Sequence, residues 1–265
     1  MKYALLERGD SLSHQLSEQF HHLAKERGFI IDKDSPELVI SIGGDGTLLQ
    51  AFHRYEPLLD KVAFVGVHTG HLGFYADWKK DEIDTLLDLM HTSEPQLVQY
   101  PLLDIVVTCD EGTTHFVALN EFNLKSVNGT LVAALHINDE PFEVFRGDGI
   151  VISTPTGSTA YNKSLGGAVI HPSLEALQIA EIASINNRVY RTLGSSVILP
   201  KHHHCDIVTQ PTDLLHISVD HLVMQMTGVN SITCSVSDRK VTFARYRPFP
   251  FWNRVREAFI GSPKQ

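Results

Sequence analysis

The segment Leu38–Thr47 places an aspartate among glycines, between a predicted strand and a predicted helix. It reads Leu-Val-Ile-Ser-Ile-Gly-Gly-Asp-Gly-Thr, and Asp45 is its one ionisable side chain. A strand that turns through glycines into a helix presents backbone N–H groups and the positive end of a helix dipole, a setting that binds phosphate. A carboxylate would repel phosphates there unless it accepts a proton or holds a metal ion. The local sequence leaves a second interpretation open, in which Asp45 is a turn residue and Thr47 caps the helix.

A pair of polar residues, Asn120 and Glu121, interrupts an otherwise apolar strand pattern in the middle of the chain. A carboxylate that is buried without a partner is costly. Either the strand lies at a sheet edge and Glu121 faces solvent, or the pair hydrogen-bonds a ligand. Carboxylates bind ribose hydroxyls in other dinucleotide sites, so the second interpretation indicates a nucleotide.

The run Thr154–Tyr161 concentrates serine and threonine hydroxyls and a glycine before a predicted short helix. Hydroxyl and N–H groups at the start of a helix can bind phosphates and amides; an ordinary Ser/Thr-rich loop is the alternative. Neither common phosphate motif is present. No G-x-G-x-x-G follows a predicted strand, and the stretch Gly157–Ser164 lacks the glycine that precedes the lysine of a P-loop.

These three segments together resemble the motifs of one enzyme family. Gly43–Thr47 is similar to the nucleotide-binding motif of the NAD kinases, which diacylglycerol, sphingosine and 6-phosphofructo-kinases share in looser form. Asn120-Glu121 resembles that family's paired polar motif, and Asp148–Tyr161 resembles its long glycine- and threonine-rich segment. The motifs occur in the family's order, and the resemblance covers residues 38–221.

The resemblance implies an enzyme that uses ATP to phosphorylate the 2′-hydroxyl of the adenosine ribose of NAD, giving NADP. Asp45 would accept the proton of that hydroxyl, and a weakly basic aspartate is sufficient because the transition state of phosphoryl transfer is loose. The family's cofactor is Mg²⁺ or another divalent cation. NAD would lie between two domains, and the chain would form a homodimer or homotetramer.

The resemblance also implies a set of residues that bind NAD or ATP. Within it, Asn120 and Glu121 would hydrogen-bond ribose hydroxyls or the adenine edge, Tyr161 would stack on a base or contact the nicotinamide, and Ala183 would line the pocket from a neighbouring chain. The expected binding residues are Gly44, Gly46, Phe74, Asn120, Glu121, Arg146, Asp148, Thr156, Thr159, Ala160, Tyr161, Asn162, Lys163, Ser164, Ala183 and His221.

Several members of this set have alternative interpretations. Arg146 is a plausible phosphate partner but also fits a surface hairpin, and Phe74 fits core packing almost as well as a pocket wall. Relatives commonly continue Ser-Leu-Ser where this chain has Asn162-Lys163-Ser164, which leaves the contact of Lys163 open. In the glycine-rich stretch Gly66–Phe74, relatives often carry asparagine where His68 stands.

Composition is ordinary for a globular protein, with 265 residues, 43% hydrophobic and 20% charged. The formal charge of −9 argues against a nucleic acid partner, while a small site can still bind anionic nucleotides. No apolar run approaches the roughly 20 residues of a membrane span, and the first residues have no signal-peptide pattern. We therefore expect a cytoplasmic protein with no membrane partner.

The hydrophobic patterns predict an α/β N-terminal domain, residues 1–100, and a β-rich, antiparallel, sandwich-like C-terminal domain, residues 101–265. In the first domain the predicted strands are 2–6, 38–42 and 62–67, and the predicted helices are 11–28, 47–59 and 79–91. In the second domain the predicted strands are 102–108, 114–124, 131–137, 142–145, 149–153, 197–199, 205–210, 214–219, 231–237 and 240–246, and the predicted helices are 173–183 and 249–260.

The sequence does not predict a protein-held metal site. Cys109, Cys205 and Cys234 lie far apart without C-x-x-C spacing, so neither a disulfide framework nor a zinc ribbon is indicated. The adjacent histidines 202–204 would point to alternating sides of an extended segment, and a solvated loop explains them.

Two rival functions stay open at this point. A related lipid kinase would share Gly-Gly-Asp-Gly but should lack the run Thr154–Tyr161, which this chain has. A non-catalytic NAD-binding sensor should have lost the central acid, whereas Asp45 is present.

Overall fold

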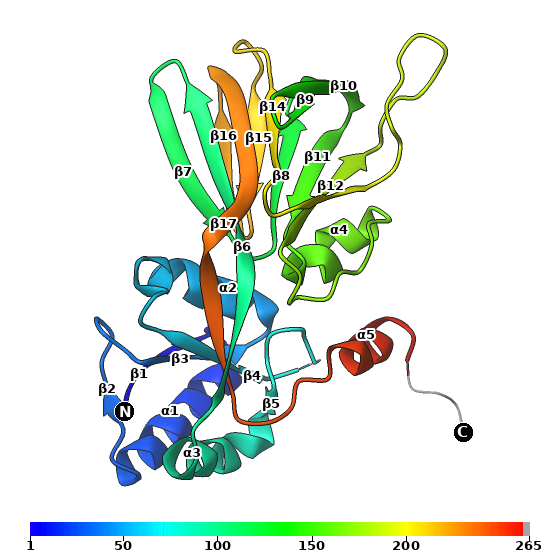
Figure 1. The fold of residues 1–265 in the computed structure, drawn as a ribbon. Helices are drawn as coiled ribbons and strands as arrows, with labels where there is room; N and C mark the ends of the chain where they lie inside the picture. Colours follow the sequence, from blue (N-terminus) through cyan, green and yellow to red (C-terminus); the bar gives the residue numbers. More distant parts are fainter. Residues whose placement is uncertain (71, 262–265) are drawn as a thin grey trace. The chain divides into compact units, whose positions relative to one another are not determined.

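The computed structural model describes residues 1–70 and 72–261, and the chain divides into two compact units (Figure 1). Unit 1 contains Met1–Gln99 and the segment from Lys240 onward, and unit 2 contains Tyr100–Arg239. Strands β6 (Gln96–Cys109) and β17 (Val229–Arg245) run from one unit into the other. The predicted domain of residues 101–265 includes the C-terminal segment, whereas that segment packs with unit 1, because the end of β17 pairs with a strand of unit 1.

Unit 1 is an α/β structure built on parallel strands, as predicted. Its strands are β1 (Lys2–Glu7), β2 (Ile30–Ile31), β3 (Leu38–Gly43), β4 (Ala63–His68) and β5 (Trp78–Lys79), in the order β4-β3-β1-β2, with β5 and the end of β17 both pairing with β4. Its helices are α1 (Ser11–Glu26), α2 (Asp45–Tyr55), α3 (Ile83–Thr92) and α5 (Phe251–Phe259), with single 3₁₀ turns at Glu56–Leu58 and Lys80–Glu82.

Helices cover both faces of this parallel sheet. Leu16, Phe20 and Ala24 recur at helical spacing on α1 and pack, with α3, against one face. Helix α2 covers the opposite face (Figure 1). The rings of Phe52 on α2 and Phe64 on β4 lie 6.4 Å apart. Strand β3 is buried along its whole length, which is typical of a parallel strand covered on both sides.

Unit 2 is a sandwich of two antiparallel sheets, also as predicted. One sheet has the order β10-β9-β14-β17 with β6 pairing to β17 and β7, and the other has the order β13-β12-β11-β8-β15-β16. Apolar side chains from both sheets form one continuous core. The remaining elements are β7 (Gly112–Ala118), β8 (Glu121–Ser126), β9 (Leu131–Ile137), β10 (Glu140–Gly147), β11 (Gly149–Ser153), the 3₁₀ turn Thr156–Thr159, α4 (Tyr161–Ser164), β12 (Ala176–Ile182), β13 (Val197–Pro200), β14 (His204–Val208), β15 (Leu215–Val219) and β16 (Leu222–Met226).

Several predicted elements after residue 100 differ from the structure. The helix predicted over 173–183 is strand β12, paired with β11 and β13. Both faces of β12 are largely buried, so its sequence shows no period-two alternation, and a short apolar run of this kind does not separate strand from helix. The strands predicted at 231–237 and 240–246 are one strand, β17, and the edge strand β16 was missed.

The strand predicted over 114–124 is broken at a position that matters for the site. Strand β7 ends at Ala118 and β8 begins at Glu121, so Asn120 lies in a bend between them.

Among the described residues, no helix is long and apolar enough to cross a membrane.

Candidate functional site

Asp45 is the first residue of helix α2, directly after the carboxyl end of strand β3. Gly44 is the N-cap and has an extended conformation. It makes no side-chain cap, because glycine has no side chain. The Asp45 carboxylate instead accepts two backbone N–H groups from the loop after β4, from Phe74 to Oδ2 at 2.8 Å and from Tyr75 to Oδ1 at 3.2 Å. The carboxylate is therefore held in one orientation at the edge of the sheet where open α/β proteins bind ligands.

Burial raises the pKa of Asp45 above its ordinary value, while several groups oppose that shift. The opposing groups are the N–H groups of Phe74 and Tyr75 and the positive charges of Arg254 and His68. A carboxylate with these neighbours binds a proton more readily than an exposed aspartate does. This property suits a proton acceptor.

The glycines around Asp45 have different physical roles. A Cβ on Gly73 would lie 2.1 Å from Asp45 Oδ1, so only glycine at 73 lets the carboxylate reach the loop. A Cβ on Gly44 or Gly46 would meet no atom within 4 Å, so the packing of the chain does not require glycine there. Glycine at 44 and 46 instead leaves the start of α2 open to a group from outside the chain.

We expect Gly73→Ala to lower turnover by about 10-fold to 100-fold, because displacing a reacting group by about 1 Å has effects of that size. The matched control is Gly70→Ala in the same loop, where an added Cβ meets no atom within 4 Å. Steady-state kinetics with circular dichroism on both variants would check this. Equal activity of the two variants would mean that the Asp45 position is not critical.

In unit 2, Asp220 holds the bend that carries Asn120 and Glu121. The Asp220 carboxylate accepts the backbone N–H groups of Leu119 at 2.9 Å, Asn120 at 2.7 Å and Glu121 at 3.1 Å. The Asp220 N–H donates to the Glu121 carbonyl at 2.9 Å, and Asp220 has a left-handed φ of 53°. The tight turn between β15 and β16 therefore fixes the bend through a carboxylate.

Glu121 is largely buried beside this second carboxylate. Burial, with the negative charge of Asp220, raises the pKa of Glu121 to about 8. Its Oε2 is buried and has no hydrogen-bond partner in the described part of the chain. The interpretation in which Glu121 faces solvent at an edge is wrong, because β8 lies inside its sheet between β11 and β15.

Polar side chains line the face of this sheet that is turned away from the sandwich core. Phe122 and Leu124 of β8 point into the core, so Glu121 and Asn123 point to the other face. Ser153 of β11 is the register partner of Glu121. Buried oxygens without a hydrogen-bond partner among the described residues occur on β8, on β11 and in the segment that follows β11: Glu121 Oε2, Asn123 Oδ1, Ser153 Oγ, Thr156 Oγ1 and Asn162 Oδ1. Buried polar atoms are nearly always bonded, so this set is suited to a polar ligand.

The segment Thr154–Ser164 folds back onto the Asn120 bend. The Thr154 hydroxyl donates to the Leu119 carbonyl at 2.6 Å, and the Thr154 N–H donates to the Asn120 carbonyl at 2.9 Å. A Cβ on Gly157 would lie 2.1 Å from the Asn120 oxygen, so glycine permits this contact. The structure thus brings the second and third sequence motifs together.

The predicted residues of this segment differ in what they contact. Asn162 is fully buried and its amide donates to the carbonyls of Ser158 and Ala168, which stabilises the loop. The Thr159 hydroxyl donates to the Thr156 carbonyl, and Tyr161 receives a hydrogen bond from Lys125 Nζ at 3.1 Å. Ser164 is exposed, while Ala160 and Lys163 are partly exposed.

Arg146, Asp148 and Ala183 lie at neighbouring strand ends of unit 2. The Arg146 guanidinium stacks over the Tyr190 ring at 4.3 Å, and the Arg146 carbonyl accepts the N–H of Ile185. Ala183 has a left-handed φ of 47°, and a Cβ on Gly147 would meet its carbonyl oxygen at 2.9 Å. Asp148, Ala183 and His221 are exposed.

The raised pKa of Glu121 predicts a pH-dependent stability. The folded chain holds the Glu121 proton up to about pH 8, whereas the unfolded chain releases it near 4.5. The folded state therefore binds more protons between these values, and the free energy of unfolding falls as pH rises through that window.

We expect Glu121→Gln to remove this pH-dependent fall in the free energy of unfolding, because glutamine does not ionise. The difference in unfolding free energy, variant minus wild type, should grow between pH 4.5 and 8 and then level off. Urea denaturation at pH 5, 6.5 and 8 would measure it. Curves that stay parallel across this range would show that Glu121 titrates normally.

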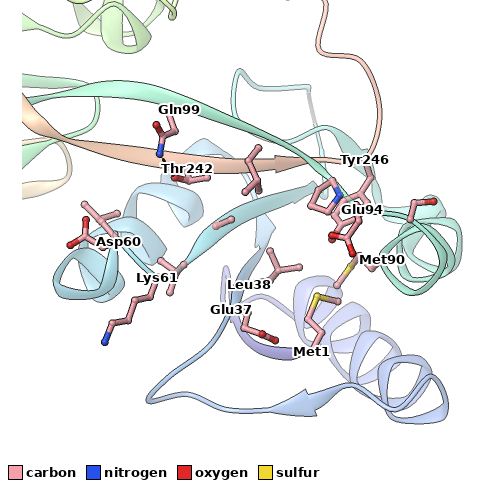
Figure 2. A pocket seen from close by; sticks show the side chains of 16 residues that line it. Met1, Glu37, Leu38, Asp60, Lys61, Met90, Glu94, Gln99, Thr242 and Tyr246 are labelled. Atoms are coloured by element: carbon pink, nitrogen blue, oxygen red, sulfur yellow. Dashed lines mark hydrogen bonds between the residues drawn. The ribbon is translucent and has the colours of Figure 1, made fainter.

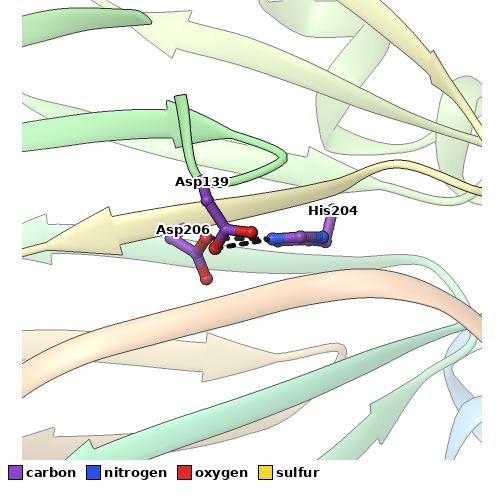
Figure 3. Close-up of side chains that lie close together, drawn as sticks. All are labelled: Asp139, His204 and Asp206. Atoms are coloured by element: carbon purple, nitrogen blue, oxygen red, sulfur yellow. Dashed lines mark ion pairs between the residues drawn. The ribbon is translucent and has the colours of Figure 1, made fainter. Parts of the chain in front are cut away.

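Two other features lie apart from these groups of residues. Asp139, His204 and Asp206 lie close together in unit 2 (Figure 3), with His204 Nε2 at 3.5 Å from Asp139 and 3.3 Å from Asp206. Ion pairing to histidine accounts for this cluster.

A cavity of about 830 Å³ in unit 1 is lined by Leu38 and Ala63, at the amino ends of β3 and β4 (Figure 2). Asp45 follows the opposite end of β3.

Comparison with known proteins places the chain in a family. Residues 13–94 match the family model of the ATP-NAD kinase N-terminal domain, and residues 119–245 match that of the ATP-NAD kinase C-terminal domain. The chain belongs to the ATP-NAD kinase family. NAD kinases of Staphylococcus aureus strains JH9 and Newman are each 53% identical to it over 268 residues, covering all of both chains.

Two solved structures share its fold. Yeast NADH kinase complexed with NADH has a TM-score of 0.83 at 17% identity, covering 100% of this chain and 89% of that one. An NAD kinase from Archaeoglobus fulgidus in complex with ATP has a TM-score of 0.74 at 18% identity, covering 93% and 94%. The family resemblance read from the three motifs is therefore confirmed, and the lipid kinase alternative is not supported.

Sequence reasoning missed several residues that hold the ATP-NAD kinase motifs in place. Gly73, Asp77 and Arg254 contact or surround the Asp45 loop, and Asp220 holds the Asn120 bend. Single charged residues far along the chain carry no local signal, so the sequence pattern alone could not have found Arg254 or Asp77. His71, in the same loop, lies outside the described residues.

Proposed function

We propose that this chain transfers the γ-phosphoryl group of ATP to the 2′-hydroxyl of the adenosine ribose of NAD, producing NADP. The observation that carries the proposal is the Asp45 carboxylate, fixed by two backbone N–H groups at the start of α2 in a member of the ATP-NAD kinase family. The non-catalytic sensor alternative has no support in this geometry, since a sensor needs no oriented acid.

Asp45 would accept the proton of the attacking hydroxyl. In a loose transition state the hydroxyl proton leaves late, so orientation of the acceptor matters more than its basicity. The open start of α2 offers N–H groups and a positive dipole end to the phosphates as negative charge develops on them.

The residues of unit 2 support recognition of a ribose. A protonated Glu121 carboxyl can donate through its hydroxyl and accept through its carbonyl oxygen, which matches a pair of ribose hydroxyls. Its pKa of about 8 keeps it largely protonated at neutral pH. The side chains of Asn123 and Ser153 offer further unpartnered oxygens nearby.

We propose Mg²⁺, or another divalent cation, as the cofactor. Within residues 1–70 and 72–261, Asp139, His204 and Asp206 form the one group of three possible ligands close enough to hold an ion, and Asp45 is not part of it. Mg²⁺ commonly keeps several waters and binds through substrate phosphates. The residues present therefore fit an ion that enters with ATP, where it would neutralise charge on the phosphates.

A coupled assay tests the proposal directly. The purified chain is mixed with NAD, ATP and Mg²⁺, and NADP is measured with an NADP-specific dehydrogenase. Product formation that depends on the metal is the expected result. Parallel reactions with diacylglycerol or sphingosine in place of NAD should give no phosphorylated lipid. Absence of NADP with intact NAD binding would favour the sensor.

We also propose a cytoplasmic homodimer or homotetramer. Apolar side chains are exposed on β10 and on the loop after β12, with Phe142 at 43%, Val144 at 47% and Val189 at 78% exposure. The Leu193 N–H donates to Glu143 Oε2 at 2.8 Å, which joins these two segments into one surface. Light scattering during dilution, with specific activity measured in parallel, would show whether activity depends on assembly.

A further inference from the structure

The loop that orients Asp45 has its own supports on the C-terminal helix. Residues Gly73–Asp77 connect β4 to β5, and two of their backbone N–H groups face the Asp45 carboxylate. Two of their carbonyls bond to a different partner. Arg254 of α5 donates from Nη1 to the carbonyls of Gly73, at 2.9 Å, and Ala76.

Arg254 is part of a buried network of three charges. Its Nη2 donates to Asp77 Oδ1 at 2.6 Å, and Arg245 Nη1 donates to Asp77 Oδ2. The Arg254 and Asp77 side chains are only 8% and 4% exposed. Both guanidinium groups also stack on Phe249, with Arg254 at 4.4 Å and Arg245 at 4.2 Å from the ring centroid. The network thus fixes the Arg254 fork in place.

Aromatic contacts attach the same loop to α5. Phe74, whose N–H donates to Asp45, stacks on Phe259 with ring centroids 5.6 Å apart and packs against Phe251 at 6.3 Å. The expectation that Phe74 lines a nucleotide pocket is untested, but its ring packs against the helix. Asp45 is therefore bonded to a loop that α5, about 200 residues further along the chain, also contacts.

A buried network of this kind is a poor way to gain stability alone. Two arginines share one aspartate, and desolvation lowers the pKa of Arg254. Apolar replacements of buried ion pairs are often as stable as the pairs. What the guanidinium fork supplies that an apolar side chain does not is a fixed position for two carbonyls and one carboxylate at once.

We propose that Arg254 is a positioning residue for the phosphoryl transfer proposed above: it holds the loop Gly73–Asp77 so that the N–H groups of Phe74 and Tyr75 fix the Asp45 carboxylate. Helix α5 is then part of the catalytic apparatus without touching substrate. The inference rests on the proposed function for its kinetic test but not for its structural test.

The structural test uses Arg254→Met, with Arg256→Met as the matched control. Arg256 is exposed on the same helix, so both variants lose one arginine from α5. Arg254→Met leaves Asp77 paired with Arg245, a neutral pair, which should allow folding. Hydrogen exchange without substrates should show at least about tenfold faster exchange at the Phe74 and Tyr75 amides in Arg254→Met alone. Unchanged protection would overturn the proposal.

The kinetic test is a double-mutant cycle with Asp45→Asn. Arg254→Met should lower kcat at least about tenfold in the wild-type chain but less than about twofold in the Asp45→Asn chain, because Arg254 acts through Asp45. Arg254→Lys should lower kcat less than Arg254→Met, since it keeps the charge without the fork. Equal losses of kcat in both backgrounds would show a general structural role and overturn the proposal.

The pH profile gives a third readout. The charged groups that face Asp45 are Arg254 on α5 and His68 on β4, and both lower the pKa of Asp45. Removing Arg254 should therefore raise that pKa and move the acidic limb of kcat to higher pH, whereas Arg256→Met should leave it in place. If the wild-type chain forms no NADP, the proposed function fails, and hydrogen exchange alone decides the positioning role.

Discussion

Replacing Asp45 with asparagine should lower turnover by at least about 100-fold, which is the lower end of the contribution of a positioned acid–base group. Asparagine keeps the shape of the side chain but does not accept a proton at neutral pH. The asparagine amide NH₂ would also face one of the two backbone N–H groups, of Phe74 or Tyr75, that donate to the Asp45 carboxylate. One of these two hydrogen bonds would then be lost. NAD affinity and the fold should change little. Steady-state kinetics and calorimetry with NAD would measure both quantities.

Comparison with the Gly73→Ala variant separates the effect of the position of the Asp45 side chain from the effect of its basicity. It displaces the carboxylate and keeps its basicity, whereas asparagine at 45 keeps the position and removes the basicity. If Asp45 is the proton acceptor, both variants lose turnover. Gly73→Ala should lose less than Asp45→Asn, because its displaced carboxylate can still accept a proton. Near-normal turnover in the Asp45→Asn variant would refute the catalytic role.

Replacing Glu121 with alanine should weaken NAD binding at least about tenfold. Two hydrogen bonds to ribose hydroxyls would be lost, each contributing about 1 kcal/mol. Stability should not fall, because Oε2 of Glu121 is buried without a partner and its removal relieves an unfavourable burial. Calorimetric titration with NAD, beside chemical denaturation, would test both parts.

The matched control for that measurement is Glu111→Ala, at the exposed turn between β6 and β7. It removes a glutamate side chain from unit 2 without touching the polar face of the sheet. Equal NAD affinity in the two variants would mean that Glu121 does not contact the dinucleotide, and the ribose assignment would then move to Asn123 or Ser153.

Local patterns in the sequence were sufficient for most elements of the fold. The spacing of Leu16, Phe20 and Ala24 predicts helix α1, and the apolar run before Gly43 predicts β3, because burial on one face or on both faces leaves a direct trace in residue order. The pattern failed at β12, which is buried on both faces, and at β16, where Val223 is 64% exposed at a sheet edge.

The sequence by itself determined which motifs are present: an acid among glycines, a polar pair, and a hydroxyl-rich run. These are contiguous, so the chemistry they imply could be stated before any fold was known. Only the tertiary structure decided how they are supported. Gly73 makes room for the Asp45 carboxylate, Arg254 holds the loop that orients it, and Asp220 holds the bend of Asn120.

The physical reason is the range of the interactions. Turn preference, helix capping and hydrophobic period act between residues a few positions apart, so they are visible in the sequence. The contacts from Arg254 to Gly73 and from Asp220 to Asn120 join residues 181 and 100 positions apart. Such pairs of residues come into contact only after strands have paired and helices have packed, so no local sequence pattern predicts them.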